Sequence, residues 1–243
     1  MQKKRYVVLD ALRGFAILGI ILANFPEFSL WTFSDPATWT RTDIVTRAFQ
    51  TFFVDGKFYT LFSLLFGIGF SIQIANAGGK LRTFYRRMAV LLLIGLIHLF
   101  FLWSGDILAL YAVCGMILPW GRVAHDLLYL LSVYPMGFAY ATGFGLVFSR
   151  SEKAPGWMLL AYPGRMACTN YLGQSVFGIL LFYGIGLGFG NRVGLLGTEL
   201  IALGVYAFQI LFSTLWMRPF TYGPVEWVWR MLSYGKRLPL KRQ

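Results

Sequence analysis

Seven long apolar stretches, separated by short polar or glycine-containing breaks, dominate the hydropathy pattern of the chain. A helix that crosses a bilayer needs about 20 mostly apolar residues, and most of these stretches approach that length. We therefore predict an all-α, polytopic transmembrane helical bundle of about seven spans. The predicted spans are residues 7–25, 52–75, 88–103, 107–120, 127–148, 166–189 and 195–217.

The remaining segments are short and more polar. Residues 226–232 combine apolar, aromatic and charged side chains, and we expect them to form an amphipathic helix in the membrane interface. The pattern divides the chain into an N-terminal half with four spans (1–121) and a C-terminal half with three spans and the interfacial tail (122–243). We expect structureless linkers at residues 29–51, 149–164 and 239–243.

Composition supports a membrane protein. The 243 residues are 57% hydrophobic and only 13% charged, whereas soluble domains usually carry about 25% charged residues. So few charges leave too little polar surface for a water-facing globule, which excludes an ordinary soluble enzyme. The net charge is +12, but the basic residues cluster between apolar stretches. The positive-inside rule explains that distribution better than nucleic-acid binding does.

The basic clusters also predict orientation, and they conflict with an odd number of spans. Residues 3–5 and 80–87 place the N-terminus and the second connection in the cytoplasm. Seven spans would put the C-terminus outside, yet the basic residues at 236–242 favour the inside. The conflict disappears if one crossing is gained or lost near residues 121–126, or if the fourth or fifth segment does not cross fully.

His98 is the most informative ionisable residue inside an apolar stretch. It follows Arg87 by eleven residues, or about 16 Å of helix, which places it near the bilayer midplane. A neutral imidazole there would either bond a neighbouring helix or act as a general base or proton relay. Asp106 approaches His98 only if the intervening turn folds back, because eight residues of helix would separate the two by about 12 Å.

Two further groups of charges admit both a structural and a functional interpretation. Asp10 and Arg13 are three residues apart and share a helix face, so they form an ion pair or leave Arg13 to bind an anionic ligand. The second group lies in the 80–87 connection. Its basic residues either mark this loop as cytoplasmic and attract anionic lipid, or bind the phosphates of CoA. Its members are Lys80, Arg82, Arg86 and Arg87.

Isolated polar residues within or beside the apolar stretches are further candidates for a functional or structural role. Asn170 and Gln174 are four apart on one helix face, where they join helices by hydrogen bonds or line a substrate cavity. Asp55 is expected near the outer face. No cluster has metal-ligand spacing and no phosphate-binding loop is present. The residues expected in a substrate-binding or structural polar role are Asp10, Asn24, Lys57, Arg165, Asn170, Gln174 and Glu226.

Several motifs, taken in order, resemble the YeiB-like family of bacterial inner-membrane proteins. They are residues 9–14 (LDALRG), 53–67, His98 with 105–108, 164–171 and 222–227. The resemblance implies a multi-pass protein of the cell inner membrane with a cytoplasmic N-terminus. It also implies longer relatives, with the missing material falling near residues 121–126.

More distantly, the chain is similar to membrane acyltransferases of the heparan-α-glucosaminide N-acetyltransferase type. They share an opening Asp-x-x-Arg-Gly helix and a helical bundle that moves acyl groups from acyl-CoA. Those enzymes use a histidine between the first two spans. Residues 25–53 of this chain contain no histidine, so that catalytic role has no counterpart here.

Two functions follow from the resemblance and the ionisable residues. In an acyltransferase, His98 would assist an acceptor hydroxyl or amine, with Asp55 or Asp106 orienting it. Acyl-CoA would be the donor, docked at Arg13, Lys80, Arg82, Arg86 and Arg87, with no tightly bound cofactor and no metal.

In a transporter of a small solute, Asp10, Arg13, His98 and Asp106 would instead line a proton-relay path. A third alternative is a shortened chain without activity. The expected partners are the lipid bilayer and anionic lipids, without nucleic acid, and a homo-oligomer is left open.

Overall fold

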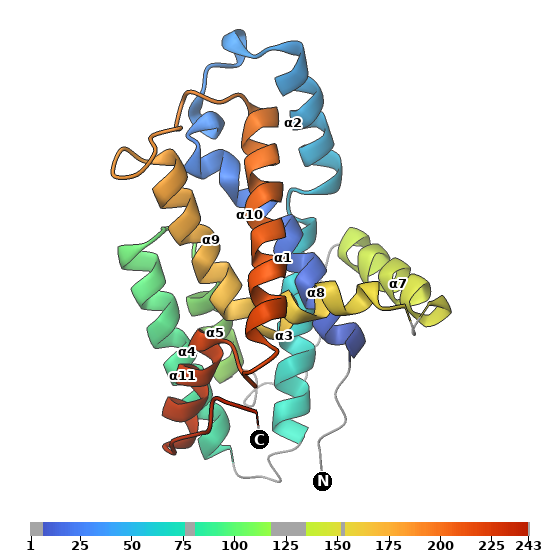
Figure 1. Cartoon of the computed structure of the whole chain (residues 1–243), viewed down its shortest axis with the longest axis vertical. Coiled ribbons are helices and arrows are strands. Elements are labelled where there is room, and N and C mark those ends of the chain that lie inside the picture. Colours follow the sequence, from blue (N-terminus) through green and yellow to red (C-terminus); the bar gives the residue numbers. More distant parts are fainter. Residues whose placement is uncertain (1–6, 76–80, 118–134, 152–153, 243) are drawn as a thin grey trace.

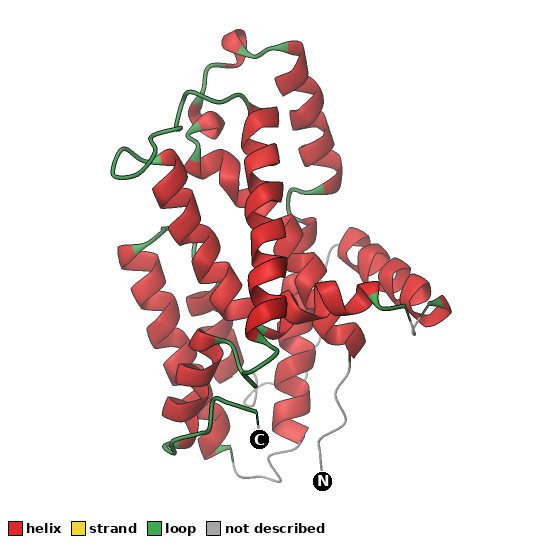
Figure 2. Ribbon diagram, viewed as in Figure 1, coloured by secondary structure: helices red, strands yellow, loops and turns green. Residues whose placement is uncertain are grey.

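A computed structural model of the chain describes residues 7–75, 81–117, 135–151 and 154–242. Within these ranges the regular elements are helices, and the one β contact is an isolated antiparallel bridge between Phe220 and Lys241 (Figure 2). The predicted all-α fold is therefore confirmed. The α-helices are α1 (Val7–Phe28), α2 (Arg41–Phe53), α3 (Lys57–Ala75), α4 (Arg82–Phe101), α5 (Leu108–Ile117), α7 (Pro135–Arg150), α8 (Gly156–Arg165), α9 (Ala167–Phe182), α10 (Leu195–Trp216) and α11 (Pro224–Tyr234).

Four helical stretches of the described chain are long and apolar enough to cross a membrane. They are Val7–Phe28, Arg41–Ala75, Arg82–Phe101 and Leu195–Trp216, and α5 and α9 are shorter apolar helices. The sixth predicted span is shorter than expected because α9 ends at Phe182, before a glycine-rich turn in which Gly188 has a positive φ. The fifth predicted span begins outside the described residues, so the count of seven stays a prediction.

Two segments that we expected to lack structure contain helices. The α2 helix begins within the predicted linker at residues 29–51, because Thr40 and Asp43 form a capping box. The Thr40 hydroxyl accepts from the Asp43 backbone N–H, and the Asp43 carboxylate accepts from the Thr40 backbone N–H. The α8 helix lies in the second predicted linker, where a run of apolar residues packs against α1.

The α1 helix is the centre of the bundle and packs against α3, α8, α9 and α10 (Figure 1). Its crossing with α8 depends on two glycines. A Cβ at Gly14 would lie 1.9 Å from the Leu160 carbonyl oxygen, and one at Gly164 would lie 1.8 Å from the Asp10 carbonyl oxygen. Small residues allow helix backbones to approach this closely in lipid.

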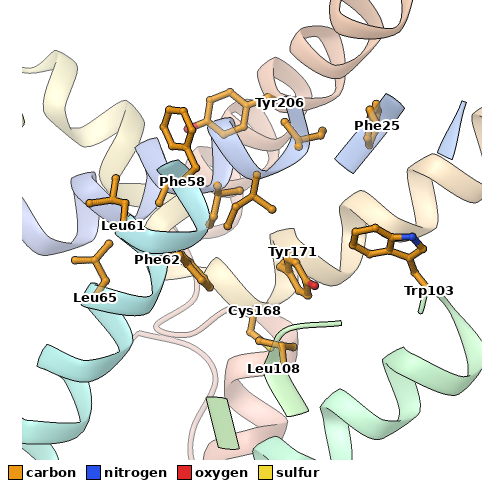
Figure 3. Packing of buried hydrophobic residues seen from close by; sticks show 14 of the residues in the cluster. Phe25, Phe58, Leu61, Phe62, Leu65, Trp103, Leu108, Cys168, Tyr171 and Tyr206 are labelled. Carbon is orange, nitrogen blue, oxygen red and sulfur yellow. The ribbon is translucent and has the colours of Figure 1, made fainter. Parts of the chain in front are cut away.

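The buried apolar core lies where α1, α3, α5 and α9 meet. Figure 3 shows Phe62 of α3, Leu108 of α5, Tyr171 of α9 and Trp103, which belong to one buried cluster. Tyr171 is 1% exposed and is among the largest fully buried side chains. This aromatic centre surrounds the polar residues that are candidates for function.

The two basic clusters of the chain meet at one end of the bundle, because α11 packs against the N-terminal half of α4 (Figure 1). Arg86 Nη2 donates to the Leu232 carbonyl oxygen over 2.9 Å, and Trp229 Nε1 donates to the Arg87 carbonyl oxygen over 2.9 Å. In Figure 1, α7 and α8 lie across the bundle rather than along it. The basic residues at the start of α4 and the α11 end of the chain therefore lie at the same end of the bundle, while the number of crossings between them stays a prediction.

Candidate functional site

His98 lies in the last turn of α4 and connects three helical segments through its imidazole. The ring is completely buried. Its Nδ1 lies 2.8 Å from Asp106 Oδ1, and its Nε2 lies 2.8 Å from the Ser175 hydroxyl of α9. The Asp106 side chain is also 0% exposed. Ser175, His98 and Asp106 therefore form a continuous hydrogen-bonded chain, which we call the polar triad.

The turn between α4 and α5 folds back, as a contact between His98 and Asp106 requires. The backbone N–H groups of Leu102 and Trp103 both donate to the His98 carbonyl oxygen, which closes the end of α4. Asp106 Oδ2 then accepts from the Ala109 backbone N–H over 2.7 Å, at the start of α5. One oxygen of the Asp106 carboxylate is therefore hydrogen-bonded to the backbone of α5, and the other is hydrogen-bonded to His98.

Aromatic side chains enclose the polar triad. The Tyr171 ring centroid lies 5.1 Å from that of His98, and the Trp103 centroid lies 6.5 Å away. Tyr171 Oη reaches the Gly105 carbonyl oxygen at 3.5 Å. Ser175 is only 2% exposed. Because water is excluded, the hydrogen bonds of the triad are electrostatically stronger than they would be at a surface.

The partners of His98 determine its tautomer. An ionised carboxylate can only accept hydrogen bonds, so Nδ1 of a neutral imidazole carries the proton and donates to Asp106. Nε2 then accepts from the Ser175 hydroxyl. A hydroxyl next to a base, with the base oriented by a third group, is the arrangement that activates a nucleophile.

Asp55, the alternative orienting carboxylate, lies elsewhere. It pairs with Arg47 of α2 at 3.0 Å, with both side chains more than a third exposed. Lys57 Nζ donates to the Thr51 carbonyl oxygen nearby. The structure therefore brings His98 together with Asp106 and places Asp55 at the α2–α3 junction.

Three other groups of predicted residues make contacts within or between helices. Asn24 is buried and accepts from the Tyr59 hydroxyl, which links α1 to α3. Asp10 and Arg13 form an ion pair at 3.1 Å on α1. Arg165, at the end of α8, lies over the Tyr162 ring at 5.9 Å.

Asn170 and Gln174 contact α10. Asn170 Nδ2 donates to the Ser213 hydroxyl over 3.0 Å, Gln174 Nε2 donates to Gln209 Oε1 over 3.1 Å, and Gln209 Nε2 donates to the Asn170 carbonyl oxygen. The sequence analysis missed Gln209 and Ser213, although their four-residue spacing within an apolar stretch is a readable signal.

The proposed CoA-binding residues do not form one free cluster. Arg86 and Arg87 of α4 contact α11, with Arg87 Nη1 donating to the Tyr234 hydroxyl over 3.2 Å. Arg82 is exposed at the start of α4. Lys80 lies outside the described residues, and Arg13 lies on α1 beside Gly69 of α3.

Glu226 of α11 caps the N-terminus of α9. Its Oε1 accepts from the backbone N–H groups of Cys168 and Thr169 over 2.7 and 3.0 Å, and its Oε2 accepts from the Thr169 hydroxyl. A carboxylate is favourable at the positive end of a helix. Burial raises the pKa of the Glu226 carboxyl above its ordinary value, although these hydrogen bonds oppose the rise.

We expect Glu226→Ala to lower the free energy of unfolding by about 1–2 kcal/mol, because two backbone donors lose their acceptor. Thermal unfolding in detergent measures the loss. Since the raised pKa means that the folded state binds the proton more tightly, wild-type stability should fall as pH rises through the folded pKa. Glu226→Gln should keep most of the stability and lose this pH dependence. Equal stability of all three proteins would contradict the cap.

The sequence analysis did not single out Glu199, whose carboxyl is also buried. Glu199 of α10 is 9% exposed and accepts from Gln50 Nε2 of α2, which also donates to the Leu22 carbonyl oxygen. No sequence signal pairs residues this far apart. Within the described ranges, no group of three or more His, Cys, Asp or Glu side chains is close enough to hold a metal ion.

The long apolar helices and their buried polar contacts define an integral membrane protein. The family described as "Protein of unknown function (DUF418)" matches residues 70–236, and the chain belongs to this family. No solved structure matches the chain. The family carries no assigned activity, so the polar triad is the basis for any functional conclusion.

Three relatives are similar to the chain. An uncharacterised 39.9 kDa protein of Bacillus acidopullulyticus is 27% identical, covering 98% of this chain and 96% of its own length. YxaH of Bacillus subtilis is 25% identical, covering 100% and 98%. YeiB of Escherichia coli is 36% identical over 63% of this chain and 42% of its own length. The predicted YeiB-like relationship is confirmed.

The relatives contain internal segments that this chain lacks. The matches to the two Bacillus proteins extend over 339 and 394 residues, which exceeds the 243 residues of this chain. This agrees with the expectation of longer relatives. The expected position of the missing material, near residues 121–126, lies outside the described residues.

Proposed function

We propose that the protein is a membrane acyltransferase in which His98, oriented by Asp106, activates a hydroxyl for acyl transfer. The observation that carries the proposal is the unbroken chain of two 2.8 Å hydrogen bonds from Asp106 through His98 to Ser175. General base catalysis needs a base within hydrogen-bond reach of the proton it removes. Here the hydroxyl in reach is that of Ser175.

In the first step, Ser175 Oγ attacks the carbonyl carbon of an acyl-CoA thioester while His98 Nε2 takes the hydroxyl proton. The carbon–sulfur bond breaks, and His98 returns the proton to the departing thiolate, so that CoA leaves as a free thiol. Asp106 stays ionised and stabilises the imidazolium that exists between the two proton transfers. The product is an ester on Ser175.

In the second step, an acceptor hydroxyl or amine gives its proton to His98 and attacks the ester carbonyl. Ser175 Oγ leaves and recovers the proton from His98, which restores the triad. The acceptor is then a small molecule or an envelope component that carries a hydroxyl or amine.

Access to the buried hydroxyl requires a movement of α4. This helix packs mainly against α5 and α11 and has few direct contacts with α9, so a local opening between His98 and Ser175 would break few α4–α9 contacts. Arg87 lies eleven residues from His98, or about 16 Å along the helix. Docking of CoA phosphates at the basic end would therefore place the thioester, on its long flexible arm, within reach of the triad.

Intact-protein mass spectrometry after incubation with acetyl-CoA tests the proposal. Wild-type protein in detergent should gain the mass of one acetyl group, and peptide mapping should place it on Ser175. Ser175→Ala should gain none. The exposed Ser104 in the turn offers a matched control, because Ser104→Ala should acylate as wild type does. Absence of any acetyl ester on the wild-type protein, with a range of acyl-CoAs, would overturn acyl transfer through Ser175.

A transporter with a proton-relay path is the second candidate. It is favoured by the burial of His98 and Asp106 and by the separate buried carboxyl of Glu199, since ionisable groups inside membranes often mark proton paths. Uptake of solute into liposomes that depends on a pH gradient, and that His98→Ala abolishes without any acyl ester on Ser175, would support transport over acyl transfer.

We infer that the protein lies in the cell inner membrane with its N-terminus and the α11 end in the cytoplasm. The support is the meeting of both basic clusters at one end. Asp35→Cys, in a background without Cys114 and Cys168, should react with a membrane-impermeant maleimide in intact cells. Lys236→Cys in the same background should react only after lysis, and the reverse pattern would invert the orientation.

A further inference from the structure

We infer that Arg87 of α4 and Arg230 of α11 form a binding site for a phosphate group at the basic end of the bundle. The site is separate from the polar triad, and it does not depend on acyl transfer. A lipid headgroup and the phosphates of a soluble nucleotide share this chemistry.

Among the described residues, neither guanidinium group forms an ion pair. Arg87 Nη1 donates to the Tyr234 hydroxyl over 3.2 Å, and Arg230 lies four residues before Tyr234, on the same face of α11. Of the side chains that the structure describes, no carboxylate lies within salt-bridge distance of either group. Two neighbouring cations repel each other, and a bound anion between them would relieve that repulsion.

Arg87 is held rigidly and is partly removed from water. Its guanidinium lies 5.3 Å from the Trp229 ring and 6.0 Å from the Tyr234 ring. Its Nε is covered by protein and has no hydrogen-bond acceptor, while its carbonyl oxygen accepts from Trp229 Nε1. Covering a charge without a counterion is unfavourable, so this environment favours an anion at the open side of the group.

Arg230 is positioned in the same way on the amphipathic helix. Its guanidinium lies 4.8 Å from the Tyr222 ring, which fixes the direction of the side chain. Two oriented guanidinium groups offer paired N–H donors that match the oxygens of phosphate. An amphipathic helix with aromatic and basic residues is typical of the membrane interface, where lipid phosphates lie.

Thermal unfolding of the purified full chain in mixed micelles tests the site. One arm adds phosphatidylglycerol in place of phosphatidylcholine, and the other adds CoA to phosphatidylcholine micelles. We expect one of these phosphate compounds to raise the Tm of the wild-type protein. Arg230→Gln should remove more than half of that rise, and Arg87→Lys, which keeps the charge but loses the paired donors, should also reduce it.

Arg218→Gln is the matched control, because Arg218 is an exposed basic residue after α10, near the same end of the bundle. It should keep the full rise in Tm. A rise with phosphatidylglycerol alone identifies the source as lipid, and a rise with CoA alone identifies a soluble phosphate. The site is wrong if neither compound stabilises the wild type, or if Arg218→Gln loses as much of the rise as Arg230→Gln does.

Discussion

Asp106→Asn is expected to slow acylation of Ser175 by about 10⁴-fold, the size of effect seen when an orienting carboxylate is replaced in a triad of this type. The asparagine amide can donate to Nδ1, and the imidazole then carries its proton on Nε2. In that tautomer His98 cannot accept the proton of Ser175, although the two side chains remain 2.8 Å apart. Single-turnover acylation followed by intact mass measures the change.

A matched variant separates this effect from loss of structure. Asp55→Asn removes the same charge from the other carboxylate considered for the role, which pairs with Arg47 at an exposed junction. It should acylate at the wild-type rate. If Asp106→Asn keeps the wild-type Tm and acylates as fast as Asp55→Asn, Asp106 does not orient the base.

Gly14→Val is expected to lower the free energy of unfolding by about 3 kcal/mol, at the upper end of what overpacking usually costs. The added Cβ would lie 1.9 Å from the Leu160 carbonyl oxygen, so α1 and α8 must move apart. That movement would also strain the 2.8 Å hydrogen bond from the Tyr206 hydroxyl to the Gly14 carbonyl oxygen. Unfolding of the detergent-solubilised protein by heat or denaturant reports the loss.

The control is Gly204→Val on α10. It places the same β-branched residue within an apolar helix, but a Cβ there has no neighbouring atom within 4 Å. Its stability should change little. Comparable losses in both variants would mean that helix propensity rather than the α1–α8 contact determines the cost at Gly14.

The sequence predicted the bounds of a helix well where the helix ends together with its apolar run. The first and seventh predicted spans, residues 7–25 and 195–217, agree closely with α1 and α10. The α2 helix was missed because its mixed polar and apolar residues have no sustained apolar run, although Thr40 and Asp43 carry a capping signal. The apolar stretches alone could not fix the number of membrane crossings. That number depends on how segments such as α8 are oriented relative to the bundle.

The sequence predicted only part of the candidate site. His98 stood out as an ionisable residue in an apolar stretch, and Asp106 was eight residues away with a turn between them. Ser175 is 77 residues from His98, and Glu226 is 57 residues from Thr169. Contacts at these separations arise from tertiary packing, which periodicity within a helix does not encode.

The cap formed by Glu226 has a consequence for biogenesis. Of the described helices, α1 precedes its main packing partner α8 in the sequence, and the start of α9 is capped by Glu226 of α11, which follows later still. Until α8 is made, the face of α1 that carries Asp10 and Gly14 lacks the helix against which it packs. We therefore expect the bundle to close only after α11 has been made, because a chain truncated before α11 would lack the cap on α9.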